Sequence, residues 1–107
     1  MAIFEGNIFT QCSYDYETVA ASQTGQVLGT TGAIGDRIER VIITSNTAAT
    51  ATVSLLDGAT SIPLLVGAAT TPLGIVTVDL GLMSVSGAWS ITTGAGATVV
   101  AIGRFSD

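Results

Sequence analysis

Apolar and polar side chains alternate with a period of two along most of this 107-residue chain. No window of eleven or more residues repeats its apolar positions at the three- and four-residue spacing of a helix. Turn signals separate the alternating stretches at intervals of roughly ten residues, and Thr, Val and Ile, which favour strands, are abundant. The pattern therefore predicts an all-β chain of about seven to nine short strands.

The predicted strands share this alternation and are mostly bounded by glycine, proline or asparagine. They cover residues 11–19, 26–28, 36–45, 51–57, 61–66, 74–80, 82–85, 87–93 and 98–105. Short strands at this spacing favour two packed antiparallel sheets. We expect a single-domain antiparallel β-sandwich, jelly-roll-like, over residues 11–107, preceded by an extended amino-terminal segment.

Two local patterns predict details of this sandwich. Strict alternation over residues 36–45 places Ile38 and Ile42 on one face of the strand, opposite Val41 and Ile43. The dipeptide Asp57-Gly58 is typical of a two-residue hairpin loop in which both positions have φ > 0.

The first ten residues form a separate amino-terminal arm, because they do not fit the strand pattern. Ile3, Phe4, Ile8 and Phe9 are large and apolar, but residues 5–7 interrupt them before an alternation is established. A segment with four such side chains is expected to be covered by other protein. Its own sandwich and another subunit are equally good candidates for that cover.

Charged side chains are scarce and make up 10% of the chain, whereas an ordinary soluble domain has about 25%. Three arginines, no lysine, no histidine and eight acidic residues give a net charge of −5. Without a basic surface to neutralise phosphates, we expect no nucleic-acid partner. Between Gly58 and Gly103 the only charged residue is Asp79, so this half of the chain is expected to form faces that a neighbour covers.

Two uncharged stretches, residues 58–78 and 80–103, are long enough to cross a membrane. Glycines and prolines divide both into short pieces with turn signals, so we expect no membrane span. No basic region precedes an apolar run at the amino terminus, which argues against a secretory leader.

Residues suited to catalysis or metal binding are few. Without His or Lys, no Ser-His-Asp or Ser-Lys set can be assembled, and Cys12 alone cannot build a zinc site. Asp15 and Glu17 are two residues apart on a predicted strand, where a solvated outer face beside Tyr14 and Tyr16 is favoured over a catalytic pair. We therefore expect no enzymatic activity, no cofactor and no metal.

Three stretches of sequence carry a resemblance to a known class of proteins. They are Gly35-Asp-Arg-Ile-Glu-Arg-Val-Ile-Ile-Thr44, Ala51-Thr-Val-Ser-Leu-Leu-Asp-Gly58, and Val85-Ser-Gly-Ala-Trp-Ser-Ile-Thr-Thr-Gly-Ala-Gly-Ala-Thr-Val99 together with Gly103-Arg-Phe105. In this order they resemble small structural proteins of tailed-phage virions. The resemblance covers roughly residues 35 to 105.

The resemblance implies a virion component, either a capsid decoration (cement) protein or a tail or fibre module. For a decoration protein, the implied partners are the major capsid protein and further copies of this chain, as a homotrimer on the capsid surface after synthesis in the host cytoplasm. The first 34 residues lie outside the resemblance, so contact residues there are inferred from their apolar or aromatic character. The candidates for capsid or subunit contact are Ile3, Phe4, Ile8, Phe9, Tyr14 and Tyr16.

A receptor- or glycan-binding module of a tail or head fibre is the alternative. It predicts that Trp89, Tyr14 or Tyr16 lies exposed in a shallow groove, where an aromatic ring can stack on a sugar. As the only tryptophan of a small sandwich, Trp89 is expected instead to be the central aromatic residue of the core.

Overall fold

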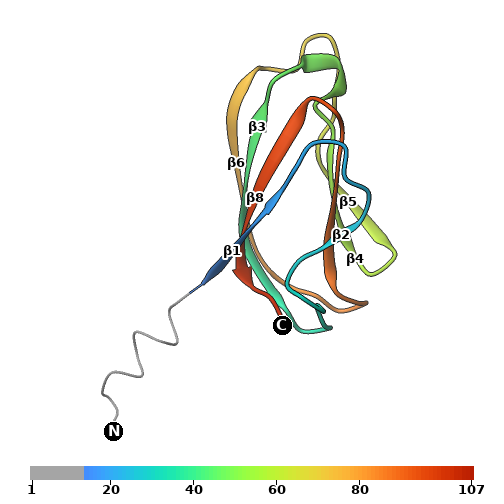
Figure 1. Cartoon of the computed structure of the whole chain (residues 1–107), viewed down its shortest axis with the longest axis vertical. Coiled ribbons are helices and arrows are strands. Elements are labelled where there is room, and N and C mark those ends of the chain that lie inside the picture. Colours follow the sequence, from blue (N-terminus) through green and yellow to red (C-terminus); the bar gives the residue numbers. More distant parts are fainter. Residues whose placement is uncertain (1–13) are drawn as a thin grey trace, which may run out of the picture.

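The computed structural model describes residues 14–107, which fold into eight β-strands and one short 3-10 helix (Figure 1). The all-β prediction is therefore confirmed. The elements are β1 (Asp15–Val19), β2 (Gln26–Val27), β3 (Arg37–Ser45), the 3-10 helix (Ala48–Thr50), β4 (Val53–Asp57), β5 (Thr60–Leu65), β6 (Gly74–Met83), β7 (Trp89–Thr93) and β8 (Ala97–Arg104).

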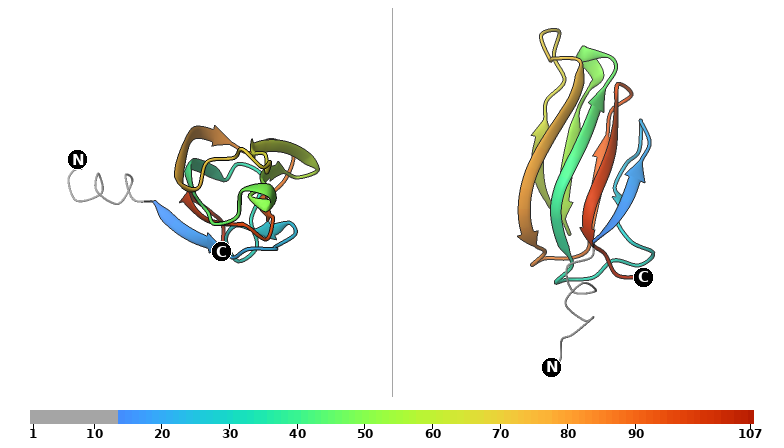
Figure 2. Two further views of the ribbon diagram at one scale, coloured as in Figure 1. Left: turned by 90° about the horizontal axis from the view of Figure 1, so that it is seen from above. Right: turned by 90° about the vertical axis from the view of Figure 1, so that its left-hand side faces the viewer.

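The strands form two four-stranded antiparallel sheets that face one another (Figure 2). The first sheet has the order β1-β8-β3-β6, and the second sheet has the order β2-β7-β4-β5. Pairing is nested along the chain, because β1 pairs with β8, β2 with β7, β3 with β6 and β4 with β5. The predicted single-domain antiparallel β-sandwich is confirmed.

The core lies between the sheets and is built from alternate positions of the strands. β4, β7 and β8 bury every second side chain, which is the period that their sequences show. Each fully buried Val, Leu or Ile stabilises the fold by roughly 1.5–3 kcal/mol relative to an exposed one. The buried apolar residues are Val19, Leu28, Ile38, Val41, Ile43, Ala51, Val53, Leu55, Trp89, Ile91, Ala97, Val99, Ala101 and Phe105.

A β-bulge at Glu39 changes which side of β3 faces the core. Ile38 pairs with Gly103 of β8 and Arg40 with Ile102, so Glu39 is an extra residue on β3. As a result Ile38 and Val41 are both buried, although they are three residues apart. The prediction of strict alternation was wrong at this point, because an inserted residue leaves no mark in the apolar period.

Gly103 allows β3 to approach β8 closely at the bulge. A Cβ atom at this position would collide with the carbonyl oxygen of Arg37 and lie 2.9 Å from Cα of Ile38. Gly103 also pairs with Asp15 on its other side, so it lies in the middle of three strands. Its lack of a side chain is therefore a steric requirement of the sheet.

β6 is one strand of ten residues, although the sequence predicts two strands at 74–80 and 82–85. Gly81, which separates the predicted strands, has a left-handed φ of +61°. Pairing with β3 nevertheless continues past it as far as Met83 opposite Arg37. The other predicted bounds differ from the observed ones by one or two residues, apart from residues 11–13, which lie outside the described residues.

The hairpin between β4 and β5 has Gly58-Ala59 as its loop. Only Gly58 has a positive φ, +60°, which is the pattern of a type II′ turn. The prediction that Asp57-Gly58 forms the loop was wrong by one residue. Asp57 is instead the last residue of β4, paired with Thr60, and its side chain is buried.

Among residues 14–107, no helix has the length and apolar character that crossing a membrane requires. The two long uncharged stretches of the sequence supply strands of the two sheets.

We expect Gly103→Ala to lower the free energy of unfolding by about 1–3 kcal/mol, because the added Cβ forces the backbones of β3 and β8 apart. Urea denaturation of the full chain measures this loss. Thr98→Ala, on the same strand but on the outer face of the sheet, is the matched control and should stay within about 0.5 kcal/mol of the wild type. Equal stabilities for Gly103→Ala and the wild type would contradict the close approach.

Candidate functional site

Two of the candidate contact residues, Tyr14 and Tyr16, lie exposed at an edge of the first sheet. Tyr14 directly precedes β1 and is 47% exposed, and Tyr16 within β1 is 73% exposed. Among residues 14–107, β1 is an edge strand whose only sheet neighbour is β8, and Tyr16 lies opposite Ile102 of that strand. Both rings therefore belong to a surface that no other part of the described chain covers.

The other four candidates, Ile3, Phe4, Ile8 and Phe9, lie outside the described residues, as does Cys12.

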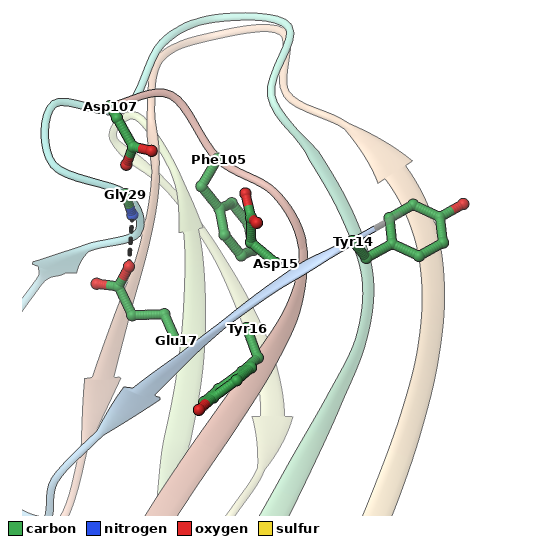
Figure 3. Close-up of a pocket in the computed structure, with 7 residues that line it drawn as sticks. All are labelled: Tyr14, Asp15, Tyr16, Glu17, Gly29, Phe105 and Asp107. Atoms are coloured by element: carbon green, nitrogen blue, oxygen red, sulfur yellow. Dashed lines mark hydrogen bonds between the residues drawn. The ribbon is translucent and has the colours of Figure 1, made fainter. Parts of the chain in front are cut away.

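A hollow of about 360 Å³ lies beside β1 (Figure 3). Its lining residues are Tyr14, Asp15, Tyr16, Glu17, Gly29, Phe105 and Asp107. In Figure 3 the two tyrosine rings lie on the opposite side of β1 from the carboxylate of Glu17, as strand alternation requires. The aromatic and acidic groups of this region thus face in different directions.

Glu17 holds the loop after β2 against β1. Its Oε1 accepts a hydrogen bond from the backbone N–H of Gly29 at 2.8 Å. Glu17 shares the inner side of β1 with buried Val19, whereas Tyr16 and Thr18 point outward. The prediction that Asp15 and Glu17 form a solvated outer face was wrong for Glu17, because the alternation of β1 places the tyrosine on the outside.

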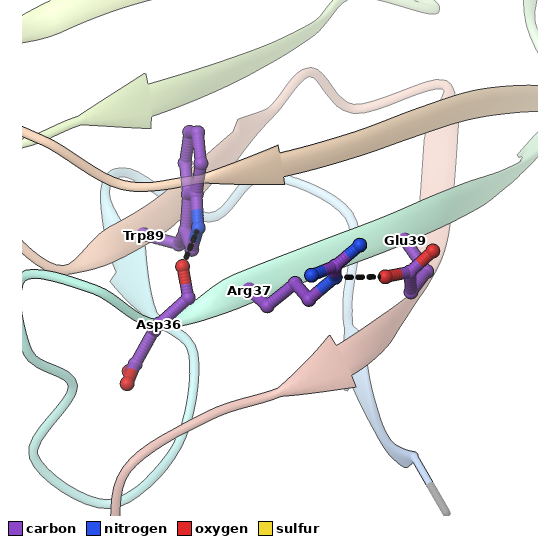
Figure 4. A network of polar contacts seen from close by, with 4 residues as sticks. All are labelled: Asp36, Arg37, Glu39 and Trp89. Carbon is purple, nitrogen blue, oxygen red and sulfur yellow. Dashed lines mark hydrogen bonds and ion pairs between the residues drawn. The ribbon is translucent and has the colours of Figure 1, made fainter. Parts of the chain in front are cut away.

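A second hollow of about 360 Å³ adjoins the first and shares Asp15 and Phe105 with it. Arg37 and Arg104 line this hollow, so it carries two of the three cations of the chain. Arg37 Nε donates a hydrogen bond to Glu39 (Figure 4). That bond raises the pKa of the Arg37 guanidinium, which therefore remains charged.

Asp36 fixes the segments that meet beneath the second hollow. Its Oδ2 accepts hydrogen bonds from the N–H groups of Ala33, at 3.0 Å, and Ser106, at 2.9 Å, and its Oδ1 accepts one from the Ser106 hydroxyl. Its backbone carbonyl oxygen accepts from the Trp89 indole N–H at 2.8 Å (Figure 4) and from the Ser84 N–H at 2.9 Å. One residue therefore joins the loop before β3, the end of the chain and the core.

Trp89 is the central aromatic residue of the core, as predicted, and is only 1% exposed. Its single polar atom is satisfied by the Asp36 carbonyl oxygen. A buried ring cannot stack on a sugar. Among the described residues, the exposed aromatic groups that could do so are Tyr14 and Tyr16.

Asp57 organises the loop between β6 and β7. Its carboxylate is 6% exposed and accepts hydrogen bonds from the backbone N–H groups of Val85 and Ser86, each at 3.0 Å, and of Gly87 at 3.2 Å. These bonds hold the pKa of the Asp57 carboxyl below its ordinary value, although burial acts in the opposite direction. A single acidic group thus fixes a loop that no strand pairing holds.

The sequence reasoning did not recognise Asp36 and Asp57 as buried structural groups. Each of them adjoins a glycine at the end of a strand, in Gly35-Asp36 and Asp57-Gly58. In a chain with so few charges, an acidic residue beside a glycine at a strand end is the sequence feature that could have indicated this structural role. Its carboxylate can accept hydrogen bonds from the N–H groups of a neighbouring loop.

Within residues 14–107, no three His, Cys, Asp or Glu side chains lie close enough together to hold a metal ion. The chain matches no family model, no curated protein and no solved structure. Function is therefore inferred from the surfaces of the sandwich and from the sequence motifs.

We expect Trp89→Phe to lower the free energy of unfolding by about 1–3 kcal/mol, because it removes a buried hydrogen bond and part of the core volume. Chemical denaturation followed by circular dichroism measures this loss. In the wild type, iodide should quench the fluorescence of this single tryptophan only after unfolding. Strong quenching in the native state would contradict its place in the core.

Asp57→Asn should lower the melting temperature at pH 7 by about 5–15 °C, since an amide cannot accept all three N–H groups as a carboxylate does. Because folding lowers the pKa of Asp57, its stabilising effect is complete above the unfolded pKa of about 3.9 and is lost as the pH falls through the folded value. Thermal melts in a series of buffers between pH 2 and pH 7 should therefore show the melting temperatures of the two proteins converging in acid.

The control for this titration is Asp79→Asn, which removes an exposed carboxylate bound only to Arg40. It should leave the melting temperature nearly unchanged at pH 7. A constant difference between Asp57→Asn and the wild type at every pH would show that the carboxylate charge is not what holds the loop.

Proposed function

We propose that this protein is a structural component of a tailed-phage virion, and specifically a capsid decoration protein. In this proposal it is made in the host cytoplasm, binds the major capsid protein on the outside of the shell and stabilises contacts between capsid subunits. Copies of the chain associate there as a homotrimer. The role needs neither a cofactor nor catalysis.

The observation that carries the proposal is the apolar surface of the charge-poor half of the chain. Large apolar side chains that are exposed in this half occur before, within and after β6: Val66, Leu73, Ile75, Leu82, Met83 and Val85. Subunits of lasting assemblies cover exposed apolar surface with a neighbour, and in this proposal the capsid or a further copy of the chain covers these side chains.

The strand order also supports this role. We interpret the nested pairing, from β1 with β8 inward to β4 with β5, as two successive Greek keys and hence as a jelly roll. Jelly rolls occur in viral capsid proteins and also in lectins, so this support is an analogy at the level of the fold. The resemblance of residues 35–105 to phage structural proteins agrees with the capsid use.

Attachment to the shell is assigned to the amino-terminal arm together with Tyr14 and Tyr16. The exposed tyrosines follow directly after the segment that carries Ile3, Phe4, Ile8 and Phe9. Aromatic side chains with one apolar and one polar end are enriched in protein interfaces.

We expect the full chain to co-sediment with shells of the major capsid protein, and deletion of residues 1–10 to weaken this binding at least about tenfold. Tyr16→Ala should weaken it in the same direction. Thr70→Ala is the control, because it changes an exposed polar residue in the loop between β5 and β6, outside the exposed apolar set. A clean monomer in light scattering that fails to bind shells would overturn the proposal.

A receptor- or glycan-binding module remains the second candidate, because Tyr14 and Tyr16 lie exposed beside a hollow with carboxylates. Burial of Trp89 removes the strongest stacking group from that candidate. Binding on a glycan array that Tyr16→Ala abolishes, without any binding to shells, would favour it over the capsid role.

A further inference from the structure

The outer edge of β6 is unusual because little prevents it from pairing with another strand. β6 has no neighbour on one side among the described residues, and it is ten residues long. Natural edge strands commonly carry several charges, a proline or a bulge that blocks pairing. β6 carries one charge, Asp79, and no proline, and its bulge, where Leu80 and the left-handed Gly81 lie opposite Glu39 of β3, is near one end of the strand. Residues 74–79 pair regularly with β3 and therefore present a regular stretch of free backbone edge that ends at this bulge.

The two faces of this stretch differ in character. Ile75, Thr77 and Asp79 lie on the outer face of the sheet and are exposed. On the inner face, Val76, Val78 and Leu80 are only half-buried, although they pack against the core. A strand added to this edge would cover the second set completely and extend the core beyond the present sandwich.

This sequence is self-complementary in one antiparallel register. Residues opposite each other must lie on the same face, so a two-fold axis has to pass through a residue position. With the axis at Val78, Val78 of one copy lies opposite Val78 of the second copy, and Val76 lies opposite Leu80 of the second copy. The inner-face side chains of the two copies are then in contact. On the outer face, Thr77 then lies opposite Asp79 of the second copy, where a hydroxyl can donate to the carboxylate.

Neighbouring registers lack this match. An axis at Asp79 would set the two carboxylates directly opposite each other, which is repulsive. An axis at Thr77 would set Asp79 opposite Ile75 of the second copy, so the carboxylate would gain no polar partner across the contact. We propose that two copies of this chain pair antiparallel through their β6 edges, about a two-fold axis at Val78, and so join two first sheets into one continuous sheet.

This contact goes beyond the proposed function, because it requires neither a capsid nor the three-fold association expected on one. A decoration protein can use both contacts on different sides of the sandwich. Binding to shells and the effect of Thr77 substitutions on self-association are separate measurements, so failure of one proposal is distinguishable from failure of the other.

The test changes Thr77 in two opposite directions and measures the dimer dissociation constant of the full chain by sedimentation equilibrium. Thr77→Asp places a carboxylate opposite Asp79 twice in each dimer and should raise the constant by about 2- to 30-fold. Thr77→Arg places a cation there and should lower it over a similar range. The same substitutions at Thr18, an exposed outward residue on the other edge strand of the sheet, are the matched controls and should leave it unchanged.

A covalent test fixes the register. In a Cys12→Ser background, Val78→Cys should form a disulfide-linked dimer on mild oxidation, because the two side chains face each other across the axis. Thr18→Cys in the same background should remain monomeric. If Val78→Cys does not fold, the exposed Thr77 variants still decide the question.

A chain that stays monomeric at millimolar concentration would overturn the β6 contact. A dimer whose dissociation constant is unchanged by both Thr77 substitutions would also overturn it. A trimer that binds shells and is insensitive to them would support the proposed function while rejecting this contact.

Discussion

The hydrogen bond from the Trp89 indole to the carbonyl oxygen of Asp36 connects the two sheets at one end of the sandwich. Trp89 begins β7 of the second sheet, and Asp36 directly precedes β3 of the first sheet. Burying an indole N–H without a partner would cost about 1–3 kcal/mol, so the bond fixes the position of the largest core side chain. The carboxylate of the same aspartate also binds Ser106, which brings the end of the chain to this point. Asp36 and Ser106 also line the second hollow.

The motifs that resemble phage structural proteins consist largely of such structural groups. Asp36, Asp57 and Trp89 are buried and bonded, and Gly103 lies where no side chain fits. Phe105 completes the core next to them. The resemblance therefore concerns how the sandwich is held together. Under the proposed function, recognition of a partner would come from surfaces outside these motifs, such as the exposed tyrosines and the edge of β6.

The sequence predicted a strand well where the strand's own side chains show which face is buried. It predicted poorly those features that depend on contacts with distant parts of the chain. β4, β7 and β8 are buried on one face along their whole length, so their period of two was sufficient to place them. The faces of β3 were not predictable, because the bulge at Glu39 is a feature of its pairing with β8, a strand distant in the sequence, at the point where Gly103 allows a close approach. The inward direction of Glu17 was not predictable for a similar reason. Its hydrogen-bond partner, Gly29, lies in a loop, where the two-residue alternation of a strand gives no information. Tyr14 and Tyr16 were chosen as contact candidates for their aromatic character, whereas their outward direction was not predicted and is set by the alternation of β1.

The nested order of the strands has a mechanical consequence. Because the first strand pairs with the last, a force applied at Tyr14 reaches the rest of the domain through the ladder between β1 and β8. That ladder consists of five residue pairs, from Asp15 opposite Gly103 to Val19 opposite Val99. A pull along the strand axis loads all five pairs together in shear, whereas a pull across the sheet opens them one after another from Asp15. The direction in which the amino-terminal end is tethered therefore determines how much tension the domain withstands.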